Sequence, residues 1–200
     1  MTDPSPSTAQ VAALARLSQL LPPDAYLAGG VAIAARLHHR ASHDLDWFVT
    51  ESDPLALADA LGAAGARIVS RADGTLYVEL AGVPVSIIRY TYPLLEPTEA
   101  LLGVRVASLE DLACMKLSAI ASRGKARDFW DLHEILTHTG RTLTGLLEAY
   151  RRKYAQHDVG HVVRSLVYFG DAEAEPLPSG LSPGRWDDIQ RDLRARVLAL

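Results

Sequence analysis

Three strand-like segments that follow one another almost without interruption constrain the fold most. They span residues 67 to 71, 75 to 80 and 83 to 90, and only the turn sequences ADG and AGV separate them. Because a parallel connection needs a dozen or more residues, links this short join antiparallel neighbours. The segment therefore predicts an antiparallel meander, and the chain must fold around a β-sheet.

Helical and strand-like patterns alternate before this meander, and helical patterns dominate after it. Apolar spacing and capping residues predict helices over 7–21, 31–39, 53–64, 108–123 and 125–138, and short strands over 25–29, 44–49 and 104–108. Two or three further helices are expected after residue 140, interrupted by a loop over 171–184. This order is typical of an α+β fold. We expect an α/β core over 1–106 and a helical C-terminal part over 107–200 that packs on the same cleft.

Composition and charge narrow the classes of function. The 200 residues carry a formal net charge of −4, which argues against extended DNA binding. The single cysteine, Cys114, cannot form an internal disulfide or a multi-cysteine zinc site, and we expect it to be buried. The sequence shows no signal-peptide pattern and no apolar run long enough to cross a membrane. We therefore expect a cytoplasmic protein without membrane contact.

The sequence DLD at 44–46 is the first candidate site. Side chains alternate across a strand, so Asp44 and Asp46 share one face with Cα atoms about 6.5–7 Å apart, while Leu45 anchors the other face. Two carboxylates this close repel each other unless a cation lies between them, and a hard divalent cation such as Mg²⁺ or Mn²⁺ suits them. Two solvated aspartates at a strand end are the alternative interpretation.

A glycine pair, Gly29–Gly30, precedes Asp44 by one short helix. Glycines between a strand and a helix let the backbone approach a ligand closely, and they leave the first helical N–H groups free to hold phosphate. A tight turn that requires a positive φ is the alternative. Arg40 and Ser42 lie between the glycines and the aspartates, where they either contact a phosphate or belong to a solvated link.

A glycine pair that opens a helix, followed by D-x-D on the next strand, resembles the nucleotidyltransferases of the DNA polymerase β type. Downstream, SLEDLACMKLSAIASRGKARDFWDL at 108–132 is similar to the signature of the AbiEii/AbiGii-type nucleotidyltransferase toxins, as is RASHDLDWF at 40–48. The resemblance extends from about Ala25 to Leu136. It implies a polymerase β-like nucleotidyltransferase core with a mixed sheet and helices, and an enzyme that moves an NMP from an NTP to a hydroxyl.

The resemblance also implies roles for individual residues. The glycine turn would hold the triphosphate, and the two aspartates of DLD would bind magnesium. Lys116 would be the phosphate-binding lysine, Asp128 would orient it or the nucleotide, and Arg123 and Lys125 would belong to the same nucleotide-binding set. A snorkelling Lys116, and ordinary pairing of Asp128 and Asp131 with nearby basic residues, remain alternatives.

The partners implied by the resemblance are an NTP, an acceptor and an antitoxin. The acceptor would be RNA, especially the tRNA 3′ end, or a protein side chain. These enzymes are the toxin halves of toxin–antitoxin or phage-defence pairs, so a cognate antitoxin is expected as well.

One position departs from the polymerase β pattern. Ser86, in the strand over 83–90, occupies the place where a third carboxylate is expected. A hydroxyl is a poorer magnesium ligand than a carboxylate and a poor general base. Glu79 lies on the preceding strand, but the sequence leaves open which face it occupies. A catalytically weak or silent member of the fold, which binds a nucleotide or a partner, is therefore the alternative to an active enzyme.

Overall fold

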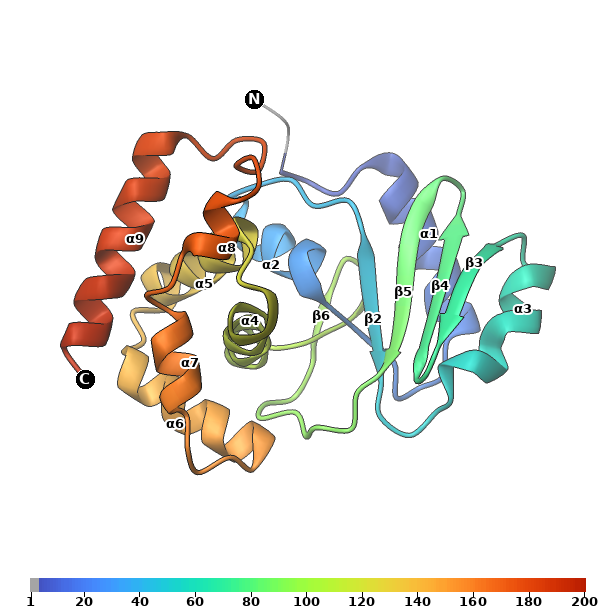
Figure 1. The fold of residues 1–200 in the computed structure, drawn as a ribbon. Coiled ribbons are helices and arrows are strands. Elements are labelled where there is room, and N and C mark those ends of the chain that lie inside the picture. Colours follow the sequence, from blue (N-terminus) through green and yellow to red (C-terminus); the bar gives the residue numbers. More distant parts are fainter. Residues whose placement is uncertain (1–3) are drawn as a thin grey trace. The chain divides into compact units, whose positions relative to one another are not determined.

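The computed structural model describes residues 4–200, which separate into two compact units (Figure 1). One unit contains the described residues up to Ser108, and the other contains Leu109–Leu200. The first unit is a β-sheet with helices, whereas the second is built from helices. The domain assignment from the sequence, with its boundary at 106 and 107 and a cleft shared by both parts, stays a prediction.

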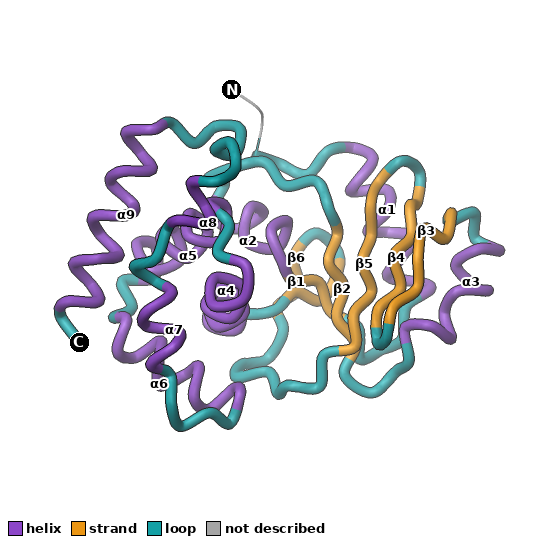
Figure 2. The backbone as a smooth tube through the Cα atoms, viewed as in Figure 1, coloured by secondary structure: helices purple, strands orange, loops and turns teal. Residues whose placement is uncertain are grey.

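A mixed sheet forms the first unit, and over the described residues it has seven strands in the order β3-β4-β5-β2-β1-β7-β6 (Figure 2). The strands are β1 (Tyr26–Ala28), β2 (Leu45–Val49), β3 (Arg67–Ala72), β4 (Thr75–Leu80), β5 (Val83–Arg89), β6 (Glu99–Leu101) and β7 (Val104–Val106). The β3, β4 and β5 strands form the predicted antiparallel meander. The β2 strand is parallel to β5 and antiparallel to β1, which places DLD near the middle of the sheet.

The helices of this unit are α1 (Thr8–Leu20), α2 (Gly29–Leu37) and α3 (Ala58–Ala63), with a 3₁₀ turn, η1 (Pro54–Leu57), before α3. The α1 helix begins with the predicted capping box. The backbone N–H of Gln10 donates to Ser7 Oγ at 3.2 Å, and the backbone N–H of Ser7 donates to Gln10 Oε1 at 2.8 Å. Along β2, Leu45, Trp47 and Val49 are buried, so one face of this strand belongs to the core.

The helical unit comprises α4 (Leu109–Arg123), α5 (Ala126–Thr139), α6 (Leu143–Tyr154), α7 (Gly160–Ser165), α8 (Gly170–Glu173) and α9 (Pro183–Leu198). Gly124, with a φ of +52°, separates α4 from α5. The rings of Phe129, Phe169 and Trp186 have centroids 5.0 to 5.8 Å apart and form an aromatic core that joins α5 to α9. Cys114 is fully buried in α4, as expected, and burial raises the pKa of its thiol to about 12.

The predicted α+β class, with a mixed sheet followed by helices, is confirmed. Two details differ from the sequence-based prediction. A short strand, β6, forms where the sequence analysis placed none, because pairing with β7 gives it hydrogen-bond partners. Four helices follow residue 140 where two or three were expected, since α7 and α8 are too short to show a helical period. Among the described residues, no helix combines the length and apolar character needed to cross a bilayer.

Candidate active site

The carboxylate of Asp46 lies over the first turn of α2. Gly29 begins this helix with a φ of +69°, a conformation that favours glycine, and a Cβ built on it would collide with Oδ2 of Asp46. Only glycine therefore fits between the backbone and this carboxylate. The sequence predicted a helix that starts at residue 31. Both glycines instead belong to α2, so its first free N–H groups lie in this close-packed region.

Gly30 permits a second close approach at the same helix start. A Cβ on Gly30 would lie 2.5 Å from Ser42 Oγ and 2.8 Å from Arg40 Nη2. The guanidinium of Arg40 also donates from Nη1 to the carbonyl oxygen of Ala41 at 2.9 Å. The structure thus brings together Gly29, Gly30, Arg40, Ser42 and Asp46, five residues that the sequence proposed for one site.

The side chains of DLD alternate between exposed and buried, as the strand pattern in the sequence predicted. Asp44 is exposed immediately before β2, Leu45 is fully buried, and Asp46 is partly exposed within the strand. Leu45 therefore anchors the strand while the two carboxylates remain accessible to solvent or a ligand.

Ser86 stands directly beside Asp46 on the neighbouring strand. Asp46 pairs with Ser86 across the parallel β2–β5 ladder and with Ala28 across the antiparallel β1–β2 ladder. Residues opposite each other in a ladder point to the same face of a sheet. Ser86 therefore supplies a hydroxyl at the position next to Asp46 where a third carboxylate was expected.

Glu79 lies on this same face of the sheet. Its neighbour two residues earlier, Tyr77, pairs with Ser86, and alternate residues of a strand share a face. The Glu79 carboxylate pairs with Arg67 at 2.7 Å on the adjacent strand β3. The strand register therefore assigns the face of Glu79, which the sequence left open.

The donor set around DLD suits a hard divalent cation. Mg²⁺ is commonly held by one or two carboxylates, with water and substrate phosphate completing its shell. Asp44 and Asp46 supply two accessible carboxylates, and Asp46 lies against a helix start that attracts phosphate. Among residues 4–200, no three His, Cys, Asp or Glu side chains group closely enough to hold a metal by themselves. A cation here would depend on substrate oxygens for part of its coordination.

A second cluster of candidate residues joins α4 to α5 within the helical unit. Lys116 is buried, and its Nζ contacts Asp128 Oδ1 at 2.9 Å and Asp131 Oδ2 at 2.7 Å. Arg123 donates to both oxygens of Asp128, from Nε at 2.9 Å and from Nη2 at 3.0 Å. Two cations and two fully buried carboxylates therefore balance each other inside one small cluster.

The ionised form of Asp128 is favoured in this cluster. Burial alone would raise the pKa of its carboxyl, but the Arg123 hydrogen bonds and the charge of Lys116 outweigh burial and lower that pKa. The family resemblance implied that Asp128 orients Lys116 or the nucleotide, and the side chains of Asp128 and Lys116 are in direct contact. Lys116 does not snorkel to solvent, because both carboxylates hold its ammonium group inside the unit.

The structure also gives the ion-pair partners of Lys125 and Asp131. Lys125, proposed for nucleotide binding, pairs with Glu175 at 3.0 Å, and its role in nucleotide binding stays a prediction. Asp131, for which the sequence offered only a shared cleft with Asp128 or ordinary pairing with nearby basic residues, holds Lys116 as closely as Asp128 does. The spacing of Asp128 and Asp131, three residues apart on a helix, was the signal that both could reach one lysine.

Comparisons with known proteins agree with the fold. A protein of Aquifex aeolicus with no characterised activity is 36% identical over 182 residues, covering 87% of this chain and 86% of its own. MenT4, a nucleotidyltransferase toxin from Mycobacterium tuberculosis, has a TM-score of 0.64 and 20% identity, with 98% of this chain and 86% of that chain covered. JHP933 from Helicobacter pylori has a TM-score of 0.56 and 18% identity, with 98% and 93% covered. The two solved structures share this fold.

The family model described as nucleotidyl transferase AbiEii toxin, Type IV TA system, matches residues 78–198. This match includes β5 with Ser86 and the Lys116 cluster, and it continues through the C-terminal helices. It does not include Gly29–Gly30 or DLD, whose place at one site rests on the geometry around α2. Because the match spans more than half of the sequence, the chain belongs to the AbiEii nucleotidyltransferase toxin family and is a nucleotidyltransferase.

Proposed function

We propose that the protein transfers an NMP from an NTP to a hydroxyl of an RNA acceptor, with a divalent cation, and acts as the toxin of a toxin–antitoxin pair. One observation carries the proposed site: the carboxylate of Asp46 packs against Gly29 at the start of α2, with Arg40 and Ser42 around Gly30. A carboxylate, a guanidinium and free helix N–H groups are the parts that bind a metal-associated triphosphate. The tRNA 3′ end is the acceptor that the sequence resemblance favours.

Different residues of the sheet unit bind the phosphates and the cation. The free N–H groups of α2, with Arg40 and Ser42, hold phosphate oxygens, and Asp44 and Asp46 hold the cation. When bound, the cation supplies positive charge to the α-phosphate and to the attacking oxygen. The acceptor oxygen then bonds to the α-phosphorus, the bond from that phosphorus to the bridging oxygen breaks, and pyrophosphate leaves. The hydroxyl proton passes to solvent or to a nearby carboxylate.

Lys116, in the helical unit, is proposed as a phosphate-binding residue, as the sequence resemblance implies. Its ammonium has three N–H donors, of which Asp128 and Asp131 accept two. We propose that the third binds a phosphate oxygen and that Asp128, held in place by Arg123, fixes the direction of Lys116. A cognate antitoxin and a cytoplasmic location also belong to the proposal.

Label transfer tests the proposed reaction. The wild-type protein is incubated with each α-labelled NTP, Mg²⁺ or Mn²⁺, total tRNA and protein extract, and label on RNA is the expected result. Replacing Asp46 with alanine should reduce transfer by at least about 100-fold, because the metal loses a carboxylate ligand. Asp187→Ala, which removes an exposed aspartate on α9, is the matched control and should transfer like wild type. Absence of label on every acceptor would contradict the reaction.

Ser86 favours one alternative, a protein that binds NTP with little turnover. Calorimetry would then show NTP binding without product. Ser86→Asp places a carboxylate beside Asp46 and should increase transfer, whereas Ser86→Asn, similar in size but neutral, should not. Robust wild-type turnover would exclude this alternative, and unchanged transfer by Ser86→Asp would show that the missing carboxylate does not limit the reaction.

A further inference from the structure

Four aromatic rings form a continuous ladder beside the candidate site. Tyr26 stacks on Phe48 at 5.9 Å between ring centroids, Phe48 meets Tyr90 edge to face at 5.0 Å, and Tyr90 meets Tyr92 at 5.1 Å. All four residues belong to the sheet unit. We refer to Tyr26, Phe48, Tyr90 and Tyr92 as the aromatic ladder.

The ladder passes from the core to the surface. Tyr26 is fully buried on β1, Phe48 and Tyr90 are partly exposed, and Tyr92 is 43% exposed. Exposure to solvent therefore increases from the inner ring of the ladder to its outer ring. Tyr92 lies beyond the end of β5 in an irregular segment, yet its ring still packs on Tyr90. The outer rings therefore form an aromatic surface open to solvent.

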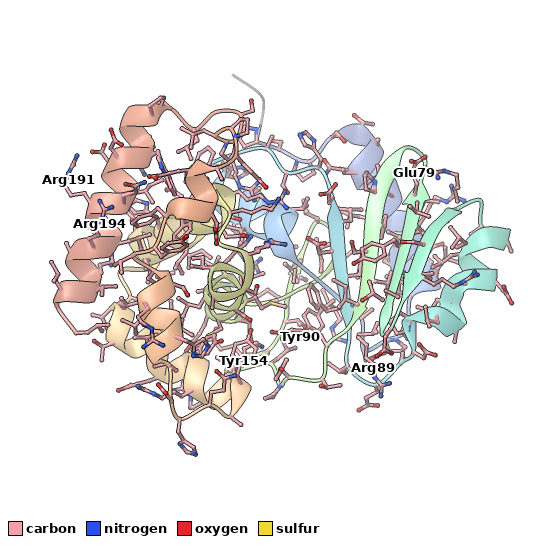
Figure 3. The ribbon with its side chains drawn as sticks, viewed as in Figure 1. Glu79, Arg89, Tyr90, Tyr154, Arg191 and Arg194 are labelled. Atoms are coloured by element: carbon pink, nitrogen blue, oxygen red, sulfur yellow. The ribbon has the colours of Figure 1, made fainter. Side chains whose placement is uncertain are left out.

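The strand register places this surface next to Asp46. Phe48 follows Asp46 by two residues on β2, so both side chains lie on one face with Cα atoms about 6.5–7 Å apart. In the β2–β5 ladder, Asp46 pairs with Ser86 and Phe48 pairs with Ile88. Tyr90 follows Ile88 by two residues, so it lies on the same side of the chain as Ser86 and Ile88. Figure 3 shows Tyr90 toward the opposite end of the sheet from Glu79. From Phe48 to Tyr90 the ladder thus leads away from Asp46 and Ser86 along one face.

We propose that Phe48, Tyr90 and Tyr92 form a stacking platform for the terminal bases of a single-stranded RNA acceptor. The proposal rests on the function proposed above and specifies the acceptor. Unpaired bases stack on aromatic side chains whatever their identity, because every base presents a flat π-face. A base on the ladder would hold the RNA end within reach of Asp46. The RNA end proposed above as the acceptor would present such unpaired bases, so the ladder suits that acceptor.

Kinetics with varied acceptor and fixed NTP test the platform. Tyr92→Ala should raise the KM for the RNA acceptor about 10-fold or more and leave the KM for the NTP unchanged, since it removes a stacking surface and no phosphate contact. Tyr92→Phe keeps the ring and should retain wild-type acceptor binding. Tyr168→Ala, which removes a tyrosine 61% exposed in the helical unit, is the matched control and should leave both constants unchanged.

A binding measurement separates this inference from the proposed reaction. Anisotropy of a fluorescent oligoribonucleotide, measured without NTP, should show the same loss of affinity in Tyr92→Ala, and circular dichroism should show an unchanged fold. If wild type labels RNA but Tyr92→Ala matches Tyr168→Ala, the platform is wrong and the reaction stands. If label appears only on protein, the platform is wrong while NMP transfer stands. If no acceptor is labelled but Tyr92→Ala still loses RNA affinity, the reaction is wrong and the platform stands.

Discussion

Two glycines determine how closely a carboxylate and a guanidinium approach the start of α2. At Gly29 the backbone conformation and the neighbouring Asp46 both exclude a side chain, and at Gly30 the side chains of Arg40 and Ser42 occupy the space of a Cβ. The absence of a Cβ at these two positions therefore lets Asp46, Arg40 and Ser42 pack against the backbone of α2. The sequence shows only that two glycines are adjacent. Their structural role depends on which side chains pack against them in the folded protein.

Gly29→Ala should lower both stability and transfer. The added Cβ meets Asp46 Oδ2 and the residue must keep a φ of +69°, so we expect a loss of about 1–3 kcal/mol in the free energy of unfolding. Displacement of the carboxylate should reduce label transfer at least about 10-fold. Urea denaturation and the transfer assay measure the two effects.

The matched control for this substitution is Gly62→Ala in α3, where a Cβ meets nothing within 4 Å. It should be neutral or stabilise by up to about 1 kcal/mol, because alanine is the better helix former. Equal behaviour of the two variants would contradict the close packing inferred at Gly29.

At the scale of elements, charged side chains join the helices of the second unit. Lys116, Asp128 and Asp131 connect α4 to α5, while a fully buried pair, Lys153 and Asp111, connects α4 to α6 at 2.6 Å. Such pairs are costly to break, since removing one partner leaves an uncompensated buried charge. The same contacts that would orient Lys116 for phosphate therefore also contribute to holding its helix in place.

Asp128→Asn should destabilise the protein by about 3 kcal/mol at neutral pH, because Lys116 and Arg123 lose a charged partner. The folded-state pKa of Asp128 is lowered, so its contribution to stability is present above the unfolded pKa of about 4 and disappears as pH falls below it. Denaturation midpoints measured between neutral and acidic pH should thus fall more steeply for wild type than for the variant.

Asp187→Asn, on the exposed face of α9, is the control for this experiment and should follow the wild-type profile. Parallel pH profiles for wild type and Asp128→Asn would show that the cluster does not depend on the charge of Asp128. A variant that unfolds at neutral pH can be compared with Asp128→Glu, which keeps the charge and should recover part of the stability.

At the scale of the whole molecule, the net charge limits how the proposed RNA acceptor could be bound. The chain carries 20 basic and 24 acidic residues, a formal net charge of −4. Proteins that bind RNA mainly through phosphates show a steep loss of affinity with salt, because each phosphate contact releases counterions. An acidic nucleotidyltransferase with an aromatic ladder should instead rely on few phosphate contacts and on stacking.

The salt dependence of RNA binding should therefore be shallow. With about three phosphate contacts on a single strand, the slope of log affinity against log salt should be near −2. Anisotropy with a fluorescent oligoribonucleotide over a range of KCl concentrations measures this slope. Tyr92→Ala should lower the affinity at every salt concentration and leave the slope unchanged, because stacking releases no counterions. A slope steeper than about −4, corresponding to six or more contacts, would contradict a binding mode dominated by stacking.

The sequence by itself determined the features that depend on neighbours along the chain. The antiparallel meander followed from short turns, the start of α1 from Ser7 and Gln10, and the burial pattern of DLD from the alternation of side chains along a strand. Resemblance to known families also predicted the contact between Lys116 and Asp128, and it identified Ser86 as the residue in place of a third carboxylate. All of these can be read within a window of a few residues or matched as a motif.

Only the tertiary structure decided which distant residues meet. Ser86 lies next to Asp46 because β2 and β5, 40 positions apart in their register, are parallel neighbours. The pairing of Lys125 with Glu175 and the ladder from Phe48 to Tyr92 also join residues that no local pattern connects. The physical reason is that periodicity reports the conformation of a segment and the face it buries. Which segment covers that face depends on the packing of the whole unit.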